Sequence, residues 1–180
     1  SDLPKERFNN MLKIALGQSK MVKRPIAGIL HIIVYAGFII INIEVLEIII
    51  DGLFGTPRVF SFLGGFYGFL IGSFEILAFL VLISVIIFWI RRMVLQIPRF
   101  WNKDLKGWPK NDALNILYFE MVLMSLFLLM NATDNHFQNL NVGNPISQYI
   151  ANLFQESSFT TVNIIERTAW WLHIVGILIF

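Results

Sequence analysis

The sequence contains no cysteine among its 180 residues. Disulfides and thiolate metal sites are therefore excluded, and so is an iron–sulfur cluster held within this chain. Charged residues are also scarce, at 14% of the chain, whereas soluble domains carry about 25%. Hydrophobic residues make up 56%, and the mean hydropathy is +0.67. This composition indicates an integral membrane protein that is long enough for one helical bundle and no second domain.

Long apolar runs predict an all-α bundle of about four transmembrane helices, because a helix needs about 20 apolar residues to cross the hydrocarbon core. The expected spans are Pro25–Ile50, a crossing within Val59–Ile90, Ala113–Met130, and a fourth that opens after Glu166-Arg167. The last apolar run, Ala169–Phe180, would rise only about 18 Å. We therefore expect the fourth span to be cut short and the natural protein to continue past its last residue.

Residues 1–24 are predicted to form an amphipathic helix on the membrane surface, ahead of a bundle formed by residues 25–180. Pro4 suits the first helical turn, and apolar side chains such as Phe8 and Met11 share one face. Lysine and arginine side chains lie largely on other faces and cluster before the first span. A solvated linker is the alternative interpretation.

The cations are distributed unevenly between the two sides of the expected bundle. Six precede the first span and six lie between the second and third spans, whereas the opposite side has only Arg58 and Arg167. The positive-inside rule therefore places the N-terminus and the Arg92–Asp112 loop in the cytoplasm. The Asp51–Arg58 turn and the polar Asn131–Arg167 segment then face outward.

Two of the three histidines lie in expected spans, His31 in the first and His173 in the fourth. An imidazole inside a membrane is costly unless it is paired, ligated or facing water, so the two residues suggest haem ligands. The alternatives are a hydrogen bond to another helix for His31 and an interfacial position for His173. The third, His136, lies in the polar loop and is expected to be solvated.

The depths of the two imidazoles exclude a single shared haem. His31 lies seven residues from Arg24, about 10 Å from the cytoplasmic boundary of the membrane. His173 lies six residues from Arg167, at a similar distance from the outer boundary. The position facing His173 on the first span falls at Ile41 or Asn42, neither of which is a good haem ligand. We expect at most one bis-histidine haem, at His31, with its partner past Phe180. His173 is then a single ligand or a hydrogen-bond donor to a quinone head group.

Four acidic residues in or near the spans are candidates for quinone or proton chemistry: Glu44, Glu47, Glu75 and Glu120. Carboxylates inside a membrane are costly and usually functional. Glu75 and Glu120 could instead be neutral and hydrogen-bonded to another helix. Glu44 and Glu47, with Asp51, lie close enough to the outer boundary to be merely solvated, although a quinol site would also need a proton acceptor there.

Several short stretches resemble one bacterial family across nearly the whole chain. They are Ala15–Pro25, Leu30-His31, Val34–Phe38, Phe74–Ala78, Met130–Ala132 and Glu166–His173. The family is that of membrane-anchored iron–sulfur oxidoreductases, whose membrane part is similar to the nitrate reductase gamma subunit and to the membrane subunit of heterodisulfide reductase. Two departures stand out. The gamma subunit has a second histidine ten residues after the first, where this chain has Ile41. Relatives often have Gly-Thr-His-Arg where this chain has Gly55-Thr56-Pro57-Arg58.

The resemblance implies a haem b module of the bacterial inner membrane that passes electrons between menaquinone or ubiquinone and an iron–sulfur partner. It also implies a cysteine-rich cytoplasmic domain of the same protein, and electron-transferring flavoprotein as a further partner. This fragment alone is not expected to be an active enzyme. The alternative is a haem-free membrane anchor that docks a soluble redox enzyme. A small transporter using Glu75 and Glu120 ranks last, because no inverted repeat is visible. The lipid bilayer is an expected partner, and nucleic acid is not.

Overall fold

The computed structural model describes residues 3–17, 25–56, 58–98, 107–139 and 144–179, without the side chain of Leu16. All regular structure in these ranges is helical, which confirms the all-α prediction. Four of these helices are long and apolar enough to cross a membrane: α2 (Pro25–Phe54), α3 (Gly65–Met93), α4 (Trp108–Thr133) and α7 (Phe159–Ile179). Residues 18–24 and 99–106, which belong to the predicted surface helix and the basic loop, lie outside the described residues.

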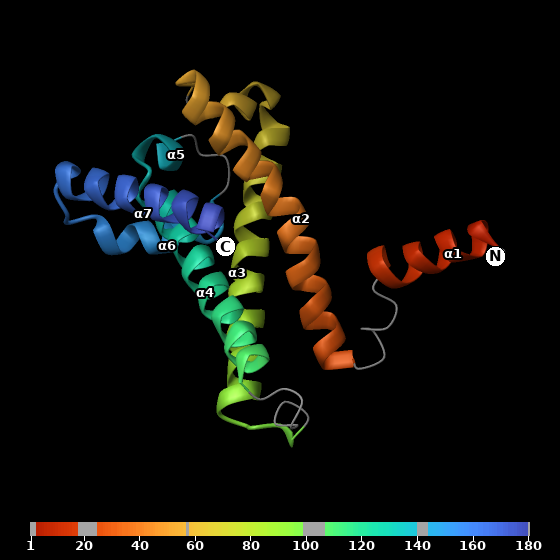
Figure 1. Cartoon of the computed structure of the whole chain (residues 1–180). Coiled ribbons are helices and arrows are strands. Elements are labelled where there is room, and N and C mark those ends of the chain that lie inside the picture. Colours follow the sequence, from red (N-terminus) through yellow and green to blue (C-terminus); the bar gives the residue numbers. More distant parts are fainter. Residues whose placement is uncertain (1–2, 18–24, 57, 99–106, 140–143, 180) are drawn as a thin grey trace.

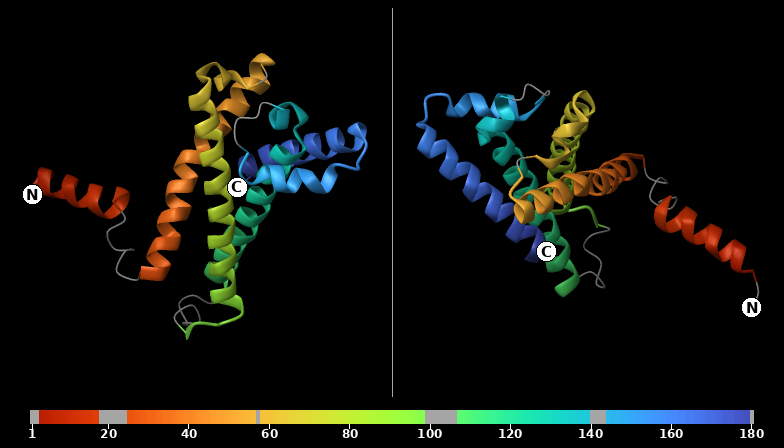
Figure 2. Two further views of the ribbon diagram at one scale, coloured as in Figure 1. Left: turned by 180° about the vertical axis from the view of Figure 1, so that it is seen from behind. Right: turned by 90° about the horizontal axis from the view of Figure 1, so that it is seen from above.

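The helices α2, α3 and α4 run side by side along the long axis of the bundle (Figure 1). The fourth, α7, packs mainly on α4 and lies across it, transverse to α2 and α3 in both side views (Figures 1 and 2). Its C-terminal end approaches the middle of the bundle, and this is how His173 reaches the interior.

Short helices follow the C-terminal ends of α2 and α4, and this end of the bundle is called the outer end below. The 3-10 helix η2 (Val59–Leu63) joins α2 to α3. Between α4 and α7 the chain forms α5 (Asn135–Asn139), α6 (Ser147–Ala151) and the 3-10 turn η5 (Asn152–Phe154). The predicted polar loop is thus partly helical, and α6 packs against α4.

Three predicted boundaries were wrong, each because a capping residue lies beyond the apolar run. The first span was predicted to end at Ile50, but α2 continues to Phe54 and ends where Gly55 adopts φ +66°. The third begins at Trp108, behind Gly107 with φ +77°. The fourth was predicted to open after Arg167, but α7 begins at Phe159, where the Ser158 hydroxyl accepts the backbone N–H of Thr161.

The burial pattern is that of a membrane protein, with apolar side chains outside and polar ones inside. Ile26, Phe38 and Phe69 are at least 60% exposed, whereas Glu44, Glu75 and His173 are at most 1% exposed. An apolar core still exists where the helices meet, built around Ile71, Phe74 and Phe127. The exposed apolar surface is suited to lipid contact, and the buried polar groups must find partners within the chain.

The N-terminal segment is helical from Pro4 to Leu16 in the part of it that the structure describes, residues 3–17. It forms α1 (Pro4–Met11) followed by the π-helix η1 (Leu12–Leu16), with Pro4 in the first turn as predicted. Both lie beside the bundle rather than packed on it (Figures 1 and 2). Phe8 and Met11 are at least 50% exposed, which leaves their apolar side chains available to a membrane surface.

Candidate functional site

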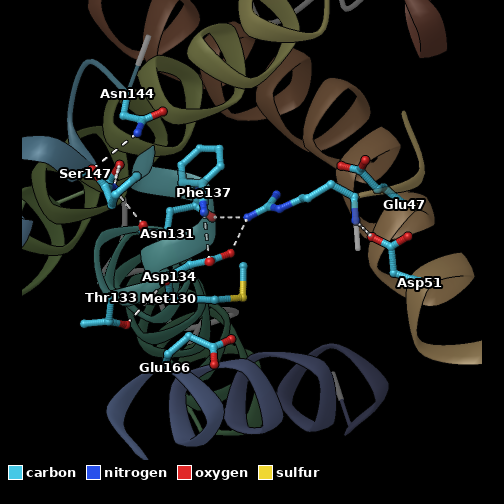
Figure 3. A network of polar contacts seen from close by, with 12 residues as sticks. Glu47, Asp51, Met130, Asn131, Thr133, Asp134, Phe137, Asn144, Ser147 and Glu166 are labelled. Atoms are coloured by element: carbon cyan, nitrogen blue, oxygen red, sulfur yellow. Dashed lines mark hydrogen bonds and ion pairs between the residues drawn. The ribbon is translucent and has the colours of Figure 1, made fainter. Parts of the chain in front are cut away.

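A buried arginine organises the outer end of the bundle. The Arg58 guanidinium donates from Nη1 to Glu44 Oε1 at 3.2 Å, and from Nη2 to Asn131 Oδ1 and Asp134 Oδ2 at 3.3 Å each. It also lies over the ring of Phe137, 4.5 Å from the centroid. Asn131, Asp134 and Phe137 lie on one side of this network, and the α2 acids Glu47 and Asp51 on the other (Figure 3). Arg58 therefore links the ends of α2 and α4.

Asp51 builds the turn that positions Arg58. Its two carboxylate oxygens accept the backbone N–H groups of Arg58 and Val59, both at 2.9 Å, and the hydroxyl of Thr56 at 2.8 Å. Burial by itself would lower the pKa of Arg58, but the surrounding groups, Glu44 first and then Tyr67, Asp134 and Glu47, together outweigh burial, and the pKa lies above its usual value. Arg58 is therefore a permanent buried cation.

Glu44 and Glu47 are not solvated, which corrects that prediction: they are 0% and 1% exposed. The chain after α2 folds back over its last turns, so that Glu47 accepts the Phe60 N–H at 2.9 Å and the Tyr67 hydroxyl at 3.1 Å. Glu44 pairs with Arg58 through one oxygen, while Oε2 has no partner in the described part of the chain. Both oxygens of Glu47 and one oxygen of Glu44 thus accept hydrogen bonds within the chain, and Oε2 of Glu44 does not in the described residues.

Glu75, in the middle of α3, holds the outer segment in place. Its Oε1 accepts the Asn131 side-chain amide at 3.3 Å, and its Oε2 accepts the backbone N–H groups of Ile146 and Ser147 at 3.1 Å each. Of the two interpretations of Glu75, the geometry matches the one in which it is hydrogen-bonded to neighbouring segments. The carboxylate caps α6 and secures it over the bundle.

Two cavities lie one after the other between α2, α4 and α7. The outer pocket has a volume of about 510 Å³ and is lined by apolar side chains such as Trp170 and Trp171 together with polar and charged ones, among them Glu47, Arg58, Asp134, His136, Glu166 and Arg167. The inner cavity has a volume of about 290 Å³, and its walls are mostly aliphatic. Along α2, Ile41 and Val45 line the inner cavity and Ile48 and Gly52 the outer pocket, so the two follow one face of that helix. The predicted solvated residue His136 thus lines the outer pocket.

The inner cavity brings together two of the predicted site residues, His173 from α7 and Glu120 from α4. Ile41 and Asn42, the α2 positions predicted to face His173, line it too. His173 is 1% exposed, and its Nδ1 lies 3.0 Å from the carbonyl oxygen of Leu123. Its Nε2 is buried and has no hydrogen-bond partner in the described ranges. Glu120 is half-buried at the same cavity.

His31 lies apart from this group. It precedes Ile41 by ten residues, which is about 15 Å along α2, and it lines neither cavity. Its imidazole is half-buried and makes no hydrogen bond or ion pair with the described residues. The structure therefore keeps the two predicted haem ligands apart, and their depths in a membrane stay a prediction.

The described residues supply part of a haem site and no more. His173 offers a buried, unpartnered nitrogen, and a hydrogen bond from the other ring nitrogen to a carbonyl is the usual arrangement of a metal-bound histidine. No second imidazole faces it across the inner cavity, and about 290 Å³ lies at the lower end of ligand pockets. His31 likewise faces no imidazole in the described ranges. A bis-histidine haem is therefore not built from these residues alone.

Sequence reasoning missed the central role of Arg58 and its partners Asn131 and Asp134, because all three were assigned to a turn or a polar loop. A signal was present. Arg58 is one of only two cations on the predicted outer side, and three acidic residues precede it on α2. A lone cation beside acids at the end of a span predicts a buried ion pair.

Comparison with known proteins gives one informative relative. A probable iron–sulfur-binding oxidoreductase of Bacillus subtilis (strain 168), FadF, is 30% identical to this chain over 178 residues. The alignment covers 98% of this chain but 24% of FadF, so the chain spans about a quarter of the relative's length. No protein-family model matches, and no solved structure matches.

Proposed function

We propose that this chain is the membrane module of an iron–sulfur oxidoreductase, which passes electrons between a quinone in the bilayer and an iron–sulfur domain. The observation that carries this proposal is the similarity to FadF, which includes all four long helices. Because the chain has no cysteine, the clusters must belong to another part of the protein or to a partner. The quinones expected are menaquinone or ubiquinone, with electron-transferring flavoprotein as a further partner.

The same proposal places the chain in the bacterial inner membrane with the N-terminus in the cytoplasm. Arg91 and Arg92 close α3 on the side that carries most of the cations. The iron–sulfur domain is proposed to lie on this side. The Arg58 network and the outer pocket then lie on the opposite side of the membrane.

Haem b at His31 remains part of the proposal. A bound haem supplies one-electron transfer, and the protein's part is to provide the axial nitrogen and an apolar surrounding. His31 is free of other polar contacts with the described residues and can provide that nitrogen.

The test uses the full-length protein, purified in detergent and kept free of oxygen. Addition of menadiol, a water-soluble naphthoquinol, is expected to reduce the iron–sulfur clusters, as followed by electron paramagnetic resonance. The visible spectrum of the reduced protein should show b-type bands. Clusters that stay oxidised with menadiol but become reduced with dithionite would contradict the proposal and leave the haem-free anchor.

A further inference from the structure

We propose that the inner cavity binds a quinone in its reduced form, through a hydrogen bond from a hydroquinone O–H to Nε2 of His173. The identification of the ring as a quinol rests on the proposed function. The preference for an O–H donor rests on the geometry of the imidazole. It reverses one of the two roles predicted from the sequence, in which His173 was either a haem ligand or a hydrogen-bond donor to a quinone.

The hydrogen bond at Nδ1 determines what Nε2 can do. A carbonyl oxygen such as that of Leu123 only accepts hydrogen bonds, so the 3.0 Å contact requires the proton to be on Nδ1. In a neutral imidazole the other nitrogen then carries a lone pair and accepts. A hydroquinone hydroxyl supplies the matching proton, whereas a quinone carbonyl does not.

Nε2 has no hydrogen-bond donor among the described residues, so a ligand that carries an O–H group would stabilise it. His173 is 1% exposed, and its ring lies 5.8 Å from that of Phe127, so bulk water does not solvate the nitrogen. A buried acceptor without a donor costs about 1–3 kcal/mol. The side-chain amide nitrogen of Asn42, at the same cavity, donates to the backbone carbonyl of Phe38 and makes no hydrogen bond to Nε2.

The shape and walls of the cavity suit one aromatic head group. A volume of about 290 Å³ is small for a ligand site, and valine, isoleucine, leucine and methionine side chains form most of its surface. Phe38, at its edge, is 60% exposed on the lipid-facing side of α2. An isoprenoid tail can therefore stay in the bilayer while the ring enters. Glu120 is a further polar residue that lines the cavity and offers a partner for another oxygen of the ring.

Haem iron is the alternative to a hydroquinone O–H as the partner of the Nε2 lone pair. A haem macrocycle needs more room than one ring, and a second ligand besides. The close packing of α7 on α4 at Gly176, where an added Cβ would come 2.6 Å from Leu123 Cδ2, leaves little space for it. If haem occupies the site, His173→Ala should lose haem; if a quinol occupies it, the same variant should keep its haem content and lose quinol binding.

The experiment measures binding of menadiol and of its oxidised form, menadione, to the full-length protein in lipid nanodiscs under anaerobic conditions. Equilibrium dialysis against protein-free nanodiscs corrects for partition into lipid. The wild-type protein is expected to bind menadiol about tenfold more tightly than menadione, as one buried hydrogen bond provides. His173→Ala should weaken menadiol binding about tenfold and change menadione binding less than about twofold.

A second variant guards against a folding defect at His173. Val45→Phe fills the cavity from the α2 side and leaves His173 in the sequence, and it should weaken binding of both ligands. His136→Ala, in the outer pocket, is the matched control and should leave both affinities unchanged. Equal affinity of the wild-type protein for menadiol and menadione would overturn the inference, and so would loss of a haem band in His173→Ala with menadiol binding intact. Neither result bears on menadiol-dependent cluster reduction, which tests the proposed function separately.

Discussion

Arg58 shows how much of the buried polarity depends on one side chain. Arg58 forms ion pairs with Glu44 of α2 and with Asp134 at the end of α4, two carboxylates that are 90 positions apart in the sequence. Removing one partner of a buried pair is costly, because the remaining charge stays buried without compensation. The contribution of such a side chain can therefore be measured through its removal.

Arg58→Met is expected to lower the free energy of unfolding by about 3–5 kcal/mol, since Glu44 is left buried without a cation. Denaturant unfolding in detergent, followed by tryptophan fluorescence, measures the change. Arg167→Gln is the control, because Arg167 is 64% exposed in its ion pair with Glu166, and such pairs contribute about 0–1 kcal/mol. Adding Glu44→Gln to Arg58→Met should recover part of the loss. An Arg58→Met protein as stable as Arg167→Gln would contradict this account.

His31→Ala in the full-length protein is expected to remove the low-spin haem signal while the protein still inserts into the membrane. The reason is that His31 is a half-buried imidazole in a span, with no polar partner among the described residues. The reduced-minus-oxidised visible spectrum gives the measurement, and His136→Ala should keep full haem content. An unchanged spectrum in His31→Ala would show that His31 only packs against its neighbours.

At the scale of helices, glycine allows the closest approach between α2 and α3. A Cβ added at Gly37 would lie 2.5 Å from Cγ2 of Val81, which is too close for two carbon atoms. Valine is stiff at χ1 and cannot turn away easily, so the helices themselves must separate. The spacing of α2 and α3 is thus determined by one small residue facing one branched residue.

Gly37→Val is expected to destabilise the protein by about 1–3 kcal/mol through overpacking. Val81→Ala in the same chain should relieve the contact and restore part of the stability. Gly65→Ala, at the start of α3 where an added Cβ meets nothing within 4 Å, serves as the control. Thermal unfolding monitored by circular dichroism distinguishes the three variants. Equal losses in Gly37→Val with and without Val81→Ala would rule out the contact as the cause.

At the scale of the whole molecule, orientation in the membrane follows from charge. The prediction places residues 1–24 in the cytoplasm and the segment between α4 and α7 outside. The test labels single cysteines from either side of the membrane. Gln138 lies in the segment between α4 and α7, but its amide donates to Asn131 O and Ser147 Oγ, so replacing it by cysteine would remove two hydrogen bonds. Ser157 is exposed and suits the purpose better.

Single cysteines can be placed in this chain without background, since it has none of its own. In sealed vesicles, an impermeant maleimide should label Asn10→Cys and Ser157→Cys from opposite sides, with Asn10→Cys reacting on the cytoplasmic side. Labelling of both from one side would contradict the topology. A detergent-solubilised sample, in which both cysteines must react, is the control.

The sequence by itself determined the class of protein and the number of long apolar helices. These properties depend on composition and on apolar length counted along the chain. The depth of His173 does not follow from such a count, because α7 lies transverse to α2 and α3. Helix ends were predicted less well, because Gly55, Gly107 and Ser158 lie outside the apolar runs that marked the spans.

The tertiary structure alone decided which polar groups meet. Arg58 reaches Asn131 across 73 positions, and His173 reaches the Leu123 carbonyl across 50. No local pattern encodes such a pairing, since it depends on how α7 lies across α4 and on how the chain after α2 folds back. That crossing also decides the tautomer of His173, because the proton must go to the nitrogen beside the Leu123 carbonyl and the lone pair is left on Nε2.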